Sequence, residues 1–138
     1  MGQQTVNRVG RGRPADAAMT QICIVDDDAS VRKSLANLLK SAGFKPLSFP
    51  SGEAFLASAA LDDSACVLLD LRMPGMQGLE VQQCLQAAGK AIRVICMSAH
   101  NDEACVAAAL QGGAAYFLRK PFSEEVLLAA ISRLVAAR

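Results

Sequence analysis

Five short apolar segments alternate with five segments of helical periodicity after residue 20, and this alternation limits the folds open to the chain. The apolar segments span residues 22–25, 46–49, 66–69, 94–97 and 115–118, and the helical segments span 30–42, 52–59, 78–88, 102–111 and 123–137. Nearly continuous apolar segments are typical of strands that are buried on both faces. Strands that alternate with helices in this way form a doubly wound sheet. We therefore predict an α/β fold with a five-stranded parallel sheet and five helices.

The composition fits a single folded domain and excludes several other classes of protein. The chain has 138 residues, of which 52% are hydrophobic and 20% are charged, so it can bury a core of its own. No apolar run reaches the 18 residues of a membrane span, and the N-terminus lacks a signal peptide's apolar stretch, so we expect no membrane partner and a cytoplasmic location. The net charge of +1 does not indicate nucleic-acid binding, and five cysteines without a CxxC spacing argue against a disulfide framework or a zinc site.

Residues 1–20 differ from the rest of the chain, because they carry three arginines, one acid and no periodic apolar pattern. We predict a flexible tail, which is either native or an artefact that precedes a true start at Met19. The sequence Arg-Gly-Arg-Pro at 11–14 resembles the core of an AT-hook, which inserts into the minor groove of DNA. A match of four residues is weak, so an inert tail is the preferred interpretation. The folded domain is expected to span residues 21–138.

Polar side chains follow four of the five predicted strands. They are Asp26, Asp27 and Asp28 after the first strand, Asp70 at the end of the third, Ser98 at the end of the fourth, and Lys120 after the fifth. Ligands of such sheets bind beyond the carboxyl ends of the strands, so we expect these side chains to form one site. Residues 50–52, which follow the second strand, have no ionisable group, as expected of a strand at the edge of the sheet.

The residue types at this end of the sheet indicate phosphoryl chemistry. Several carboxylates placed together repel one another unless a cation binds between them, and their oxygen atoms favour Mg²⁺. A lysine and a hydroxyl opposite the carboxylates can then bind phosphoryl oxygens. Asp70 is the candidate nucleophile, because an aspartate can form an acyl phosphate. Most isolated runs of three acids are solvated charge without a function, but the agreement of four strand ends argues against that interpretation here.

The same stretches resemble the response-regulator receiver domain. They are Ile-Val-Asp-Asp-Asp at 24–28, Leu-Asp-Leu-Arg-Met-Pro-Gly at 69–75, Ser-Ala at 98–99 and Lys-Pro-Phe at 120–122. The resemblance covers residues 20–138 and is greatest to the FixJ-type subgroup, which has a similar Val-Arg-Lys-Ser-Leu in its first helix, here at 31–35. It implies a CheY-like sheet with the strand order 2-1-3-4-5. Members of this subgroup commonly carry a C-terminal helix-turn-helix output domain.

The resemblance also implies a phosphoacceptor and a metal site. Asp70 is the implied phosphoacceptor, and Asp26 and Asp27 are the acidic pair. Mg²⁺ would be bound directly by Asp27, by Asp70 and by the backbone carbonyl of Arg72, whereas Asp26 would act through water. Asp28 stands where glutamate is commoner, which keeps the charge.

Two further residues are implied to contact the phosphoryl group, and one to respond to it. Lys120 pairs with the phosphoryl group, and the hydroxyl of Ser98 bonds to one of its oxygens. The switch aromatic three residues before Lys120 is Phe117 and not Tyr116. Pro121 favours a cis peptide bond after Lys120.

We predict a phosphoacceptor module, not an enzyme, that receives a phosphoryl group from a histidine kinase or a histidine phosphotransferase. Phosphorylation is expected to promote homodimerisation through the fourth helix and the fifth strand. Control of transcription, and any contact with DNA, would require an output domain absent from this chain. The last predicted helix reaches the end of the chain, which favours an excised receiver, and a stand-alone regulator that acts by protein contact is the alternative.

Two other functions fit the sequence less well. A Mg²⁺-dependent phosphohydrolase typically carries a second acid two residues after its nucleophile, where this chain has Arg72. A scaffold that is never phosphorylated normally loses the acidic residues, all of which are present here.

A few other features allow more than one interpretation. The strand cysteines, which are Cys23, Cys66 and Cys96, are predicted to be small buried hydrophobes. His100 is interpreted as a loop residue that tunes access to Ser98 rather than as a phosphate carrier. The outer face of the alanine-rich helix over 102–111 either serves only sheet packing or forms a contact patch beside Phe117, and both interpretations stay open.

Overall fold

The computed structural model describes residues 20–99 and 103–136. The strands are β2 (Gln21–Val25), β3 (Lys45–Phe49), β4 (Cys66–Asp70), β5 (Arg93–Ser98) and β6 (Tyr116–Arg119). The helices are α2 (Ala29–Ser41), α3 (Gly52–Leu56), α4 (Gly78–Ala87), α5 (Glu103–Gln111) and α6 (Glu124–Ala136), with a short 3-10 helix, η1, at Ala59–Asp63. The predicted tail, apart from Thr20, and His100 lie outside the described residues. Within the described ranges, no helix is long and apolar enough to cross a membrane.

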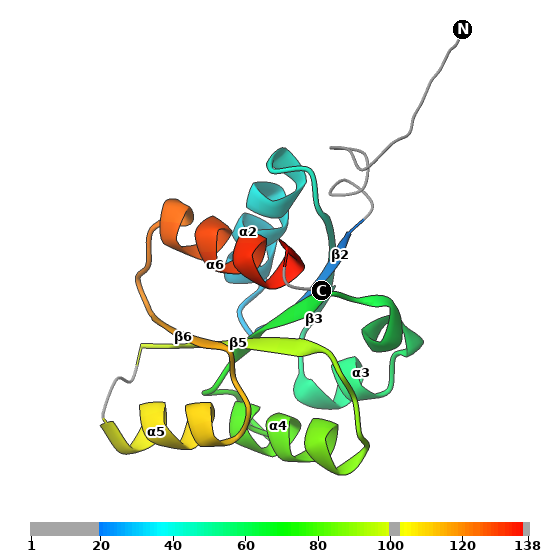
Figure 1. Ribbon diagram of the computed structural model, residues 1–138, viewed down its shortest axis with the longest axis vertical. Helices are drawn as coiled ribbons and strands as arrows, with labels where there is room; N and C mark the ends of the chain where they lie inside the picture. The colour runs from blue at the N-terminus through cyan, green and yellow to red at the C-terminus, as the bar shows by residue number, and fades with distance from the viewer. Residues whose placement is uncertain (1–19, 100–102, 137–138) are drawn as a thin grey trace, which may run out of the picture.

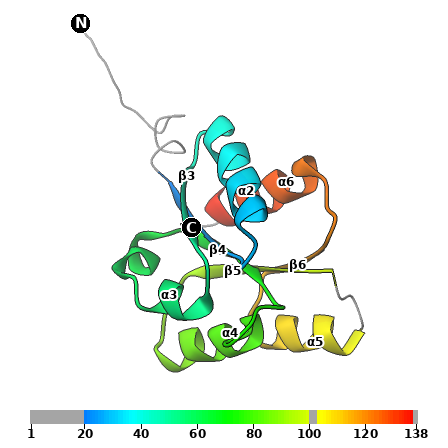
Figure 2. The same ribbon diagram turned by 180° about the vertical axis from the view of Figure 1, so that it is seen from behind.

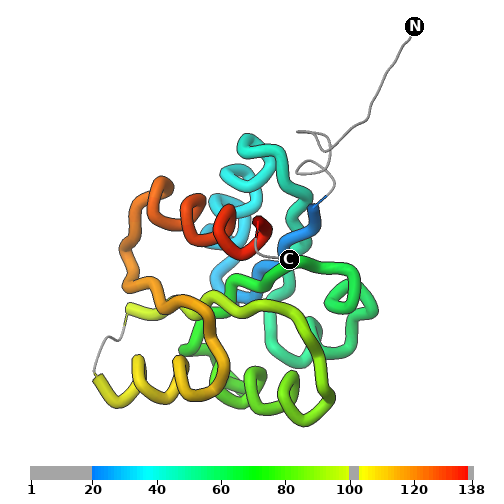
Figure 3. The backbone as a smooth tube through the Cα atoms, viewed as in Figure 1, coloured from blue at the N-terminus to red at the C-terminus, as the bar shows by residue number. Residues whose placement is uncertain are grey.

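The five strands form one parallel sheet in the order β3-β2-β4-β5-β6. Counted along the described chain, this is the order 2-1-3-4-5, so the predicted fold class is confirmed. The strand β3 lies at one edge, as the lack of an ionisable residue after it indicates. Helices α2 and α6 cover one face of the sheet, and α3, α4 and α5 cover the other (Figure 1, Figure 2). Figure 3 follows the chain from β2 through each strand and helix to α6.

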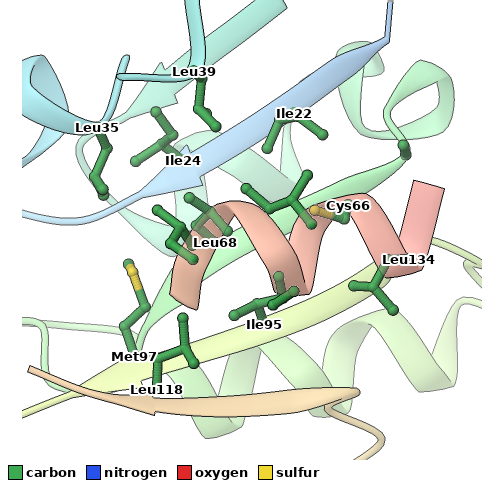
Figure 4. Close-up of a cluster of buried hydrophobic side chains, with 14 residues drawn as sticks. Ile22, Ile24, Leu35, Leu39, Cys66, Leu68, Ile95, Met97, Leu118 and Leu134 are labelled. Atoms are coloured by element: carbon green, nitrogen blue, oxygen red, sulfur yellow. The ribbon is translucent and has the colours of Figure 1, made fainter. Parts of the chain in front are cut away.

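The core consists of two layers because successive residues of a strand point to opposite faces of the sheet. On the α2 and α6 side, Ile24, Leu68 and Ile95 pack against helix residues that include Leu39 and Leu134 (Figure 4). The second layer lies under α3, α4 and α5 and is built from Cys23, Val25, Val67, Leu69, Cys96, Phe55, Val81 and Leu85, among others. The strands β2 and β4 are buried along nearly their whole length, as their continuous apolar sequence predicts.

One predicted helix is wrong in its second half. The sequence pattern predicts a helix over 52–59, whereas α3 ends at Leu56. The Ser58 hydroxyl accepts a hydrogen bond from Ala60 N–H at 3.0 Å and begins η1 instead. Serine side chains compete with the helical backbone in this way and favour helix starts. The new turn buries Leu61 in the layer beneath α3 and α4.

Candidate functional site

The carboxyl ends of four parallel strands place the predicted site residues at one end of the sheet. Asp70 is the last residue of the central strand β4, and Ser98 is the last residue of the neighbouring β5. Asp26 directly follows β2, and Lys120 directly follows β6. Asp26, Asp70 and Ser98 are only 1%, 5% and 0% exposed, so polar groups are buried at the end of an apolar sheet.

Lys120 joins the two buried carboxylates. Its Nζ lies 2.9 Å from Asp26 Oδ2 and 3.9 Å from Asp70 Oδ1. The backbone fixes the root of this side chain, because Lys120 N–H donates to the Ser98 carbonyl at 2.9 Å. The peptide bond from Lys120 to Pro121 is cis, as the sequence predicts.

Asp26 is held by several hydrogen bonds at the start of α2. Its Oδ1 accepts a hydrogen bond from Asp28 N–H at 3.0 Å, while Oδ2 accepts from Lys120. Its backbone carbonyl accepts from Arg32 Nη1 at 2.7 Å. No signal in the sequence indicates this role for Arg32, which lies on the first turns of a predicted helix among other polar residues.

Asp28 belongs to the helix cap and not to the acidic cluster. Its Oδ1 accepts hydrogen bonds from the Ser30 hydroxyl at 2.7 Å, from Ser30 N–H at 2.9 Å and from Val31 N–H at 3.4 Å. These hydrogen bonds, that of the Ser30 side chain most of all, lower the pKa of Asp28. The expectation that all three consecutive aspartates gather at the site is therefore wrong for Asp28, because the N-cap of α2 engages its carboxylate.

The carboxyl group of Asp70 binds a proton more tightly than an ordinary aspartate does. Burial raises the pKa of Asp70 to about 6, and the negative charges of Asp26 and Asp27 add to this effect. The ammonium of Lys120 and a hydrogen bond from Arg72 N–H, at 3.2 Å, oppose it. A bound cation between the carboxylates would therefore stabilise the ionised form of Asp70.

The three carboxylates of Asp26, Asp27 and Asp70 make a fitting site for a hard divalent cation. One oxygen of each lies within 4.8 Å of the others. Asp27 is exposed and, within the described part of the chain, its carboxylate has no hydrogen-bond or ion-pair partner. An all-oxygen donor set that is open to water on one side suits Mg²⁺, which keeps several of its waters.

A glycine allows the loop after Asp70 to fold back over β4. A Cβ on Gly78 would lie 2.6 Å from the Asp70 carbonyl oxygen and 2.8 Å from Leu71 Cα. Gly78 N–H also donates to the Leu71 carbonyl at 3.2 Å, which closes the loop that carries Arg72. Sequence reasoning missed this residue, although a glycine at the first position of a predicted helix is a visible signal.

Comparison with known proteins identifies the family. The response regulator receiver domain matches residues 22–132 of the chain. The chain belongs to this family. It is 42% identical over 108 residues to the transcriptional regulatory protein FixJ of Azorhizobium caulinodans, and the matched region covers 78% of this chain and 51% of FixJ. It is also 43% identical over 110 residues to the response regulator protein TmoT of Ectopseudomonas mendocina, and this match covers 80% of this chain and 50% of TmoT.

A solved structure agrees with this assignment. The structure of FixJ-N superposes with a TM-score of 0.77 at 37% identity, over 86% of this chain and 94% of that one. The resemblance to the FixJ-type subgroup is thereby confirmed. The chain spans about half the length of the curated relatives that it matches.

The two aromatic residues of β6 lie on opposite faces of the receiver's sheet. Phe117 is half-buried and packs with the layer under α3, α4 and α5, whereas Tyr116 packs with the layer under α2 and α6. Phe117 is therefore the one that shares a layer with α5. Its role as the switch aromatic, like that of Ser98, stays a prediction.

The strand cysteines of the receiver are core residues, as predicted. Cys23, Cys66 and Cys96 are all buried, and burial raises the pKa of Cys66 and of Cys96 to about 12. Thiols with such values remain protonated and unreactive at neutral pH.

Proposed function

We propose that this receiver accepts a phosphoryl group on Asp70 from a histidine kinase or a histidine phosphotransferase. The observation that supports this most strongly is the setting of Asp70 at the end of the central strand. Its carboxylate lies 3.9 Å from Lys120 Nζ and within 4.8 Å of carboxylate oxygens of Asp26 and Asp27. A nucleophile, a cation and two further acids are thus brought together from three strand ends.

In the proposed reaction, an oxygen of the ionised Asp70 carboxylate attacks the phosphorus of a phosphohistidine. The new oxygen–phosphorus bond forms as the donor's nitrogen–phosphorus bond breaks, and the histidine nitrogen keeps the electron pair. Lys120 supplies positive charge to the transferred group, because its ammonium already lies between Asp26 and Asp70. Ser98, at the end of the adjacent strand, is proposed to donate its hydroxyl to a second phosphoryl oxygen.

We propose Mg²⁺ as the cofactor, held by residues whose present contacts suit their roles. Asp27 and Asp70 would bind the ion directly, together with the backbone carbonyl of Arg72. Asp26, whose two oxygens accept hydrogen bonds from Asp28 N–H and from Lys120, would act through water. Bound there, Mg²⁺ would offset the negative charge of the transferred phosphoryl group.

The proposal extends to the output of the receiver. FixJ of Azorhizobium caulinodans is a transcriptional regulatory protein about twice as long as the matched region, so we propose control of transcription through an output domain that makes the DNA contact. We propose that phosphorylated receivers dimerise through α5 and β6. We also propose a cytoplasmic location, because the kinases that supply the phosphoryl group use ATP there. The apolar outer face of α5 supports this surface, because Leu110 is 47% exposed.

The test is phosphorylation of the chain by acetyl phosphate in the presence of Mg²⁺, followed by intact mass. We expect one added phosphoryl group, which hydroxylamine removes because it is an acyl phosphate. Asp70→Asn should abolish the addition, whereas Asp63→Asn, at an exposed acid on η1, and His100→Ala should retain it. Addition that persists in Asp70→Asn, or that withstands hydroxylamine, would overturn the assignment.

A further inference from the structure

Two glutamines of α4 hold the C-terminal end of α5. Gln82 Nε2 donates a hydrogen bond to the Ala109 carbonyl at 2.9 Å, and Gln86 Nε2 donates to the Gly112 carbonyl at 2.8 Å. The two side chains leave the same face of α4, because residues four apart lie one turn above each other. Helices α4 and α5 lie side by side on one face of the sheet (Figure 1, Figure 2).

The end of α5 is shaped to receive these amides. Gly113 has a φ of 101°, and Ala114 N–H donates back to the Ala109 carbonyl at 3.1 Å, which ends the helix in a Schellman motif. A Cβ on Gly112 would lie 3.1 Å from Gln82 Nε2, and one on Gly113 would lie 3.1 Å from Gln86 Nε2. The two glycines therefore let the amide groups approach the backbone.

Burial of the Gln82 amide is unfavourable unless the amide makes a hydrogen bond that compensates for it. The residue is 1% exposed, and within the described residues its Oε1 has no hydrogen-bond partner. An apolar side chain at this position would avoid a buried acceptor without a donor. The compensating contact is the hydrogen bond to Ala109, which is the buried residue of α5.

The other end of α5 is held less firmly. Its first two residues, Glu103 and Ala104, are exposed, and Cys105 and Val106 are only partly buried. Because this half of the helix has less buried surface than the last turn, its backbone hydrogen bonds open more readily.

We propose that Gln82 and Gln86 are positioning residues that make the last turn of α5 a fixed pivot, so that occupancy of Asp70 moves the first half of the helix. This inference rests on the proposed phosphorylation of Asp70. Ser98 ends β5 five residues before α5 begins, so along the chain the first half of α5 is nearer to the site than its last turn is. The glutamines thereby decide which part of the α5 surface changes.

The experiment compares amide hydrogen exchange, residue by residue by NMR, with and without Mg²⁺ and beryllofluoride, which mimics the phosphoryl group. In the unchanged protein, we expect the exchange of Ala107 and Ala108 to respond to beryllofluoride and that of Gly112 and Ala114 to stay constant. In the double variant Gln82→Leu/Gln86→Leu, Gly112 and Ala114 should respond as well. Their exchange without beryllofluoride should also rise about fivefold, as the loss of a hydrogen bond implies.

Gln83→Leu is the matched control, because Gln83 is an exposed glutamine on the same helix. Gln86→Lys retains a donor and should keep the last turn protected. If the double variant does not fold, Gln86→Leu alone tests the same claim at an exposed position. A last turn that responds to beryllofluoride in the unchanged protein, or glutamine variants that behave like Gln83→Leu, would overturn the inference.

Failure of the pivot can be told apart from failure of the proposed function. Fluorine NMR reports whether beryllofluoride occupies the site, and intact mass reports whether Asp70 is phosphorylated. If Asp70 is not occupied, the proposed function fails, and exchange in the untreated variants alone decides whether the glutamines hold the end of α5. If it is occupied and the whole of α5 responds equally, the pivot fails and the proposed function stands.

Discussion

At the scale of single residues, three consecutive aspartates have three different environments. Asp26 is buried and binds Lys120, Asp27 is exposed, and Asp28 caps α2. The backbone at the start of the helix determines these differences, since the residues are chemically identical. The carboxylate of Asp27 is therefore available to bind a cation, whereas that of Asp28 is engaged in the helix cap. Substitution of each residue can measure this difference.

We predict that Asp27→Asn weakens Mg²⁺ binding at least about tenfold and leaves the apo fold as stable as before or more stable, because the variant removes one of three mutually repelling carboxylates. Titration calorimetry with Mg²⁺ measures the affinity, and thermal unfolding in chelator measures the stability. Asp28→Asn is the matched control and should bind Mg²⁺ with unchanged affinity. Equal effects of the two substitutions would contradict the assignment of Asp27 as a direct ligand.

Asp70 leads to a second prediction at this scale, which concerns pH. Because the folded protein raises the pKa of Asp70 to about 6 from its ordinary value of 3.8, the folded state binds a proton that the unfolded state releases. The contribution of this proton to stability is complete below pH 4 and is lost as the pH rises through 6. Without metal, Asp70→Asn should therefore be more stable than the unchanged protein by about 2 kcal/mol at pH 7, and about equal to it near pH 4.

Urea denaturation in chelator at the two pH values measures this difference. Added Mg²⁺ should shrink the difference at pH 7, because the ion favours the ionised carboxylate. If Asp70→Asn is less stable than the unchanged protein at pH 7, or if the difference in stability does not change with pH, burial does not raise the pKa of Asp70.

At the scale of elements, short polar side chains decide where helices begin. Asp28 begins α2 and Ser58 begins η1, each by accepting hydrogen bonds from the next turn's backbone. The cap of α2 lies beside the site, whereas the cap of η1 lies away from it. The cap of α2 also positions Asp26, because the N–H of Asp28 donates to Asp26 Oδ1.

We predict that Asp28→Ala lowers the melting temperature by a few degrees, as the loss of an N-cap does, whereas Asp28→Ser restores most of it. Thermal unfolding followed by circular dichroism gives both values. Asp63→Ala, at an exposed acid on η1, serves as the control for loss of charge. Similar melting temperatures for Asp28→Ala and Asp28→Ser would show that the cap does not stabilise α2.

The order of elements and most of the site follow from the sequence, for identifiable reasons. Continuous apolar strands indicate a buried parallel sheet, and the carboxyl ends of such strands bring Asp70, Ser98 and Lys120 to one end of it. Periodicity cannot separate Asp28 from its neighbours, nor the buried Gln82 from the exposed Gln83. Such differences depend on backbone geometry and on tertiary contacts between residues that lie far apart in the sequence.

At the scale of the whole molecule, the site and the proposed output surface lie in one continuous structure. Asp70 ends the central strand, β5 lies between it and β6, and α5 packs beside them. Two large apolar side chains of the described surface are exposed, Leu110 on α5 at 47% and Val126 on α6 at 51%. An exposed apolar group is significant here only if it lies in a surface that becomes buried.

We predict that Leu110→Lys reduces dimerisation of the beryllofluoride-treated protein at least about tenfold, because it places a charge in the proposed interface. Light scattering over a range of protein concentrations measures the dimer. Val126→Lys is the control, since it changes an equally exposed residue outside α5 and β6. A dimer that is sensitive to Val126→Lys and not to Leu110→Lys would place the interface elsewhere, and a monomer with an occupied site would indicate a different kind of partner.

The most direct test of the central claim is a crystal structure of the chain with Mg²⁺ and beryllofluoride. We expect the beryllium on an oxygen of Asp70, with Lys120 Nζ and the Ser98 hydroxyl on its fluorines. Mg²⁺ should be bound by Asp27, by Asp70 and by the carbonyl of Arg72, with Asp26 reached through water. Beryllofluoride on any other residue, or a metal ion that avoids Asp27 and Asp70, would contradict the assignment of Asp70 as the phosphoacceptor of this receiver.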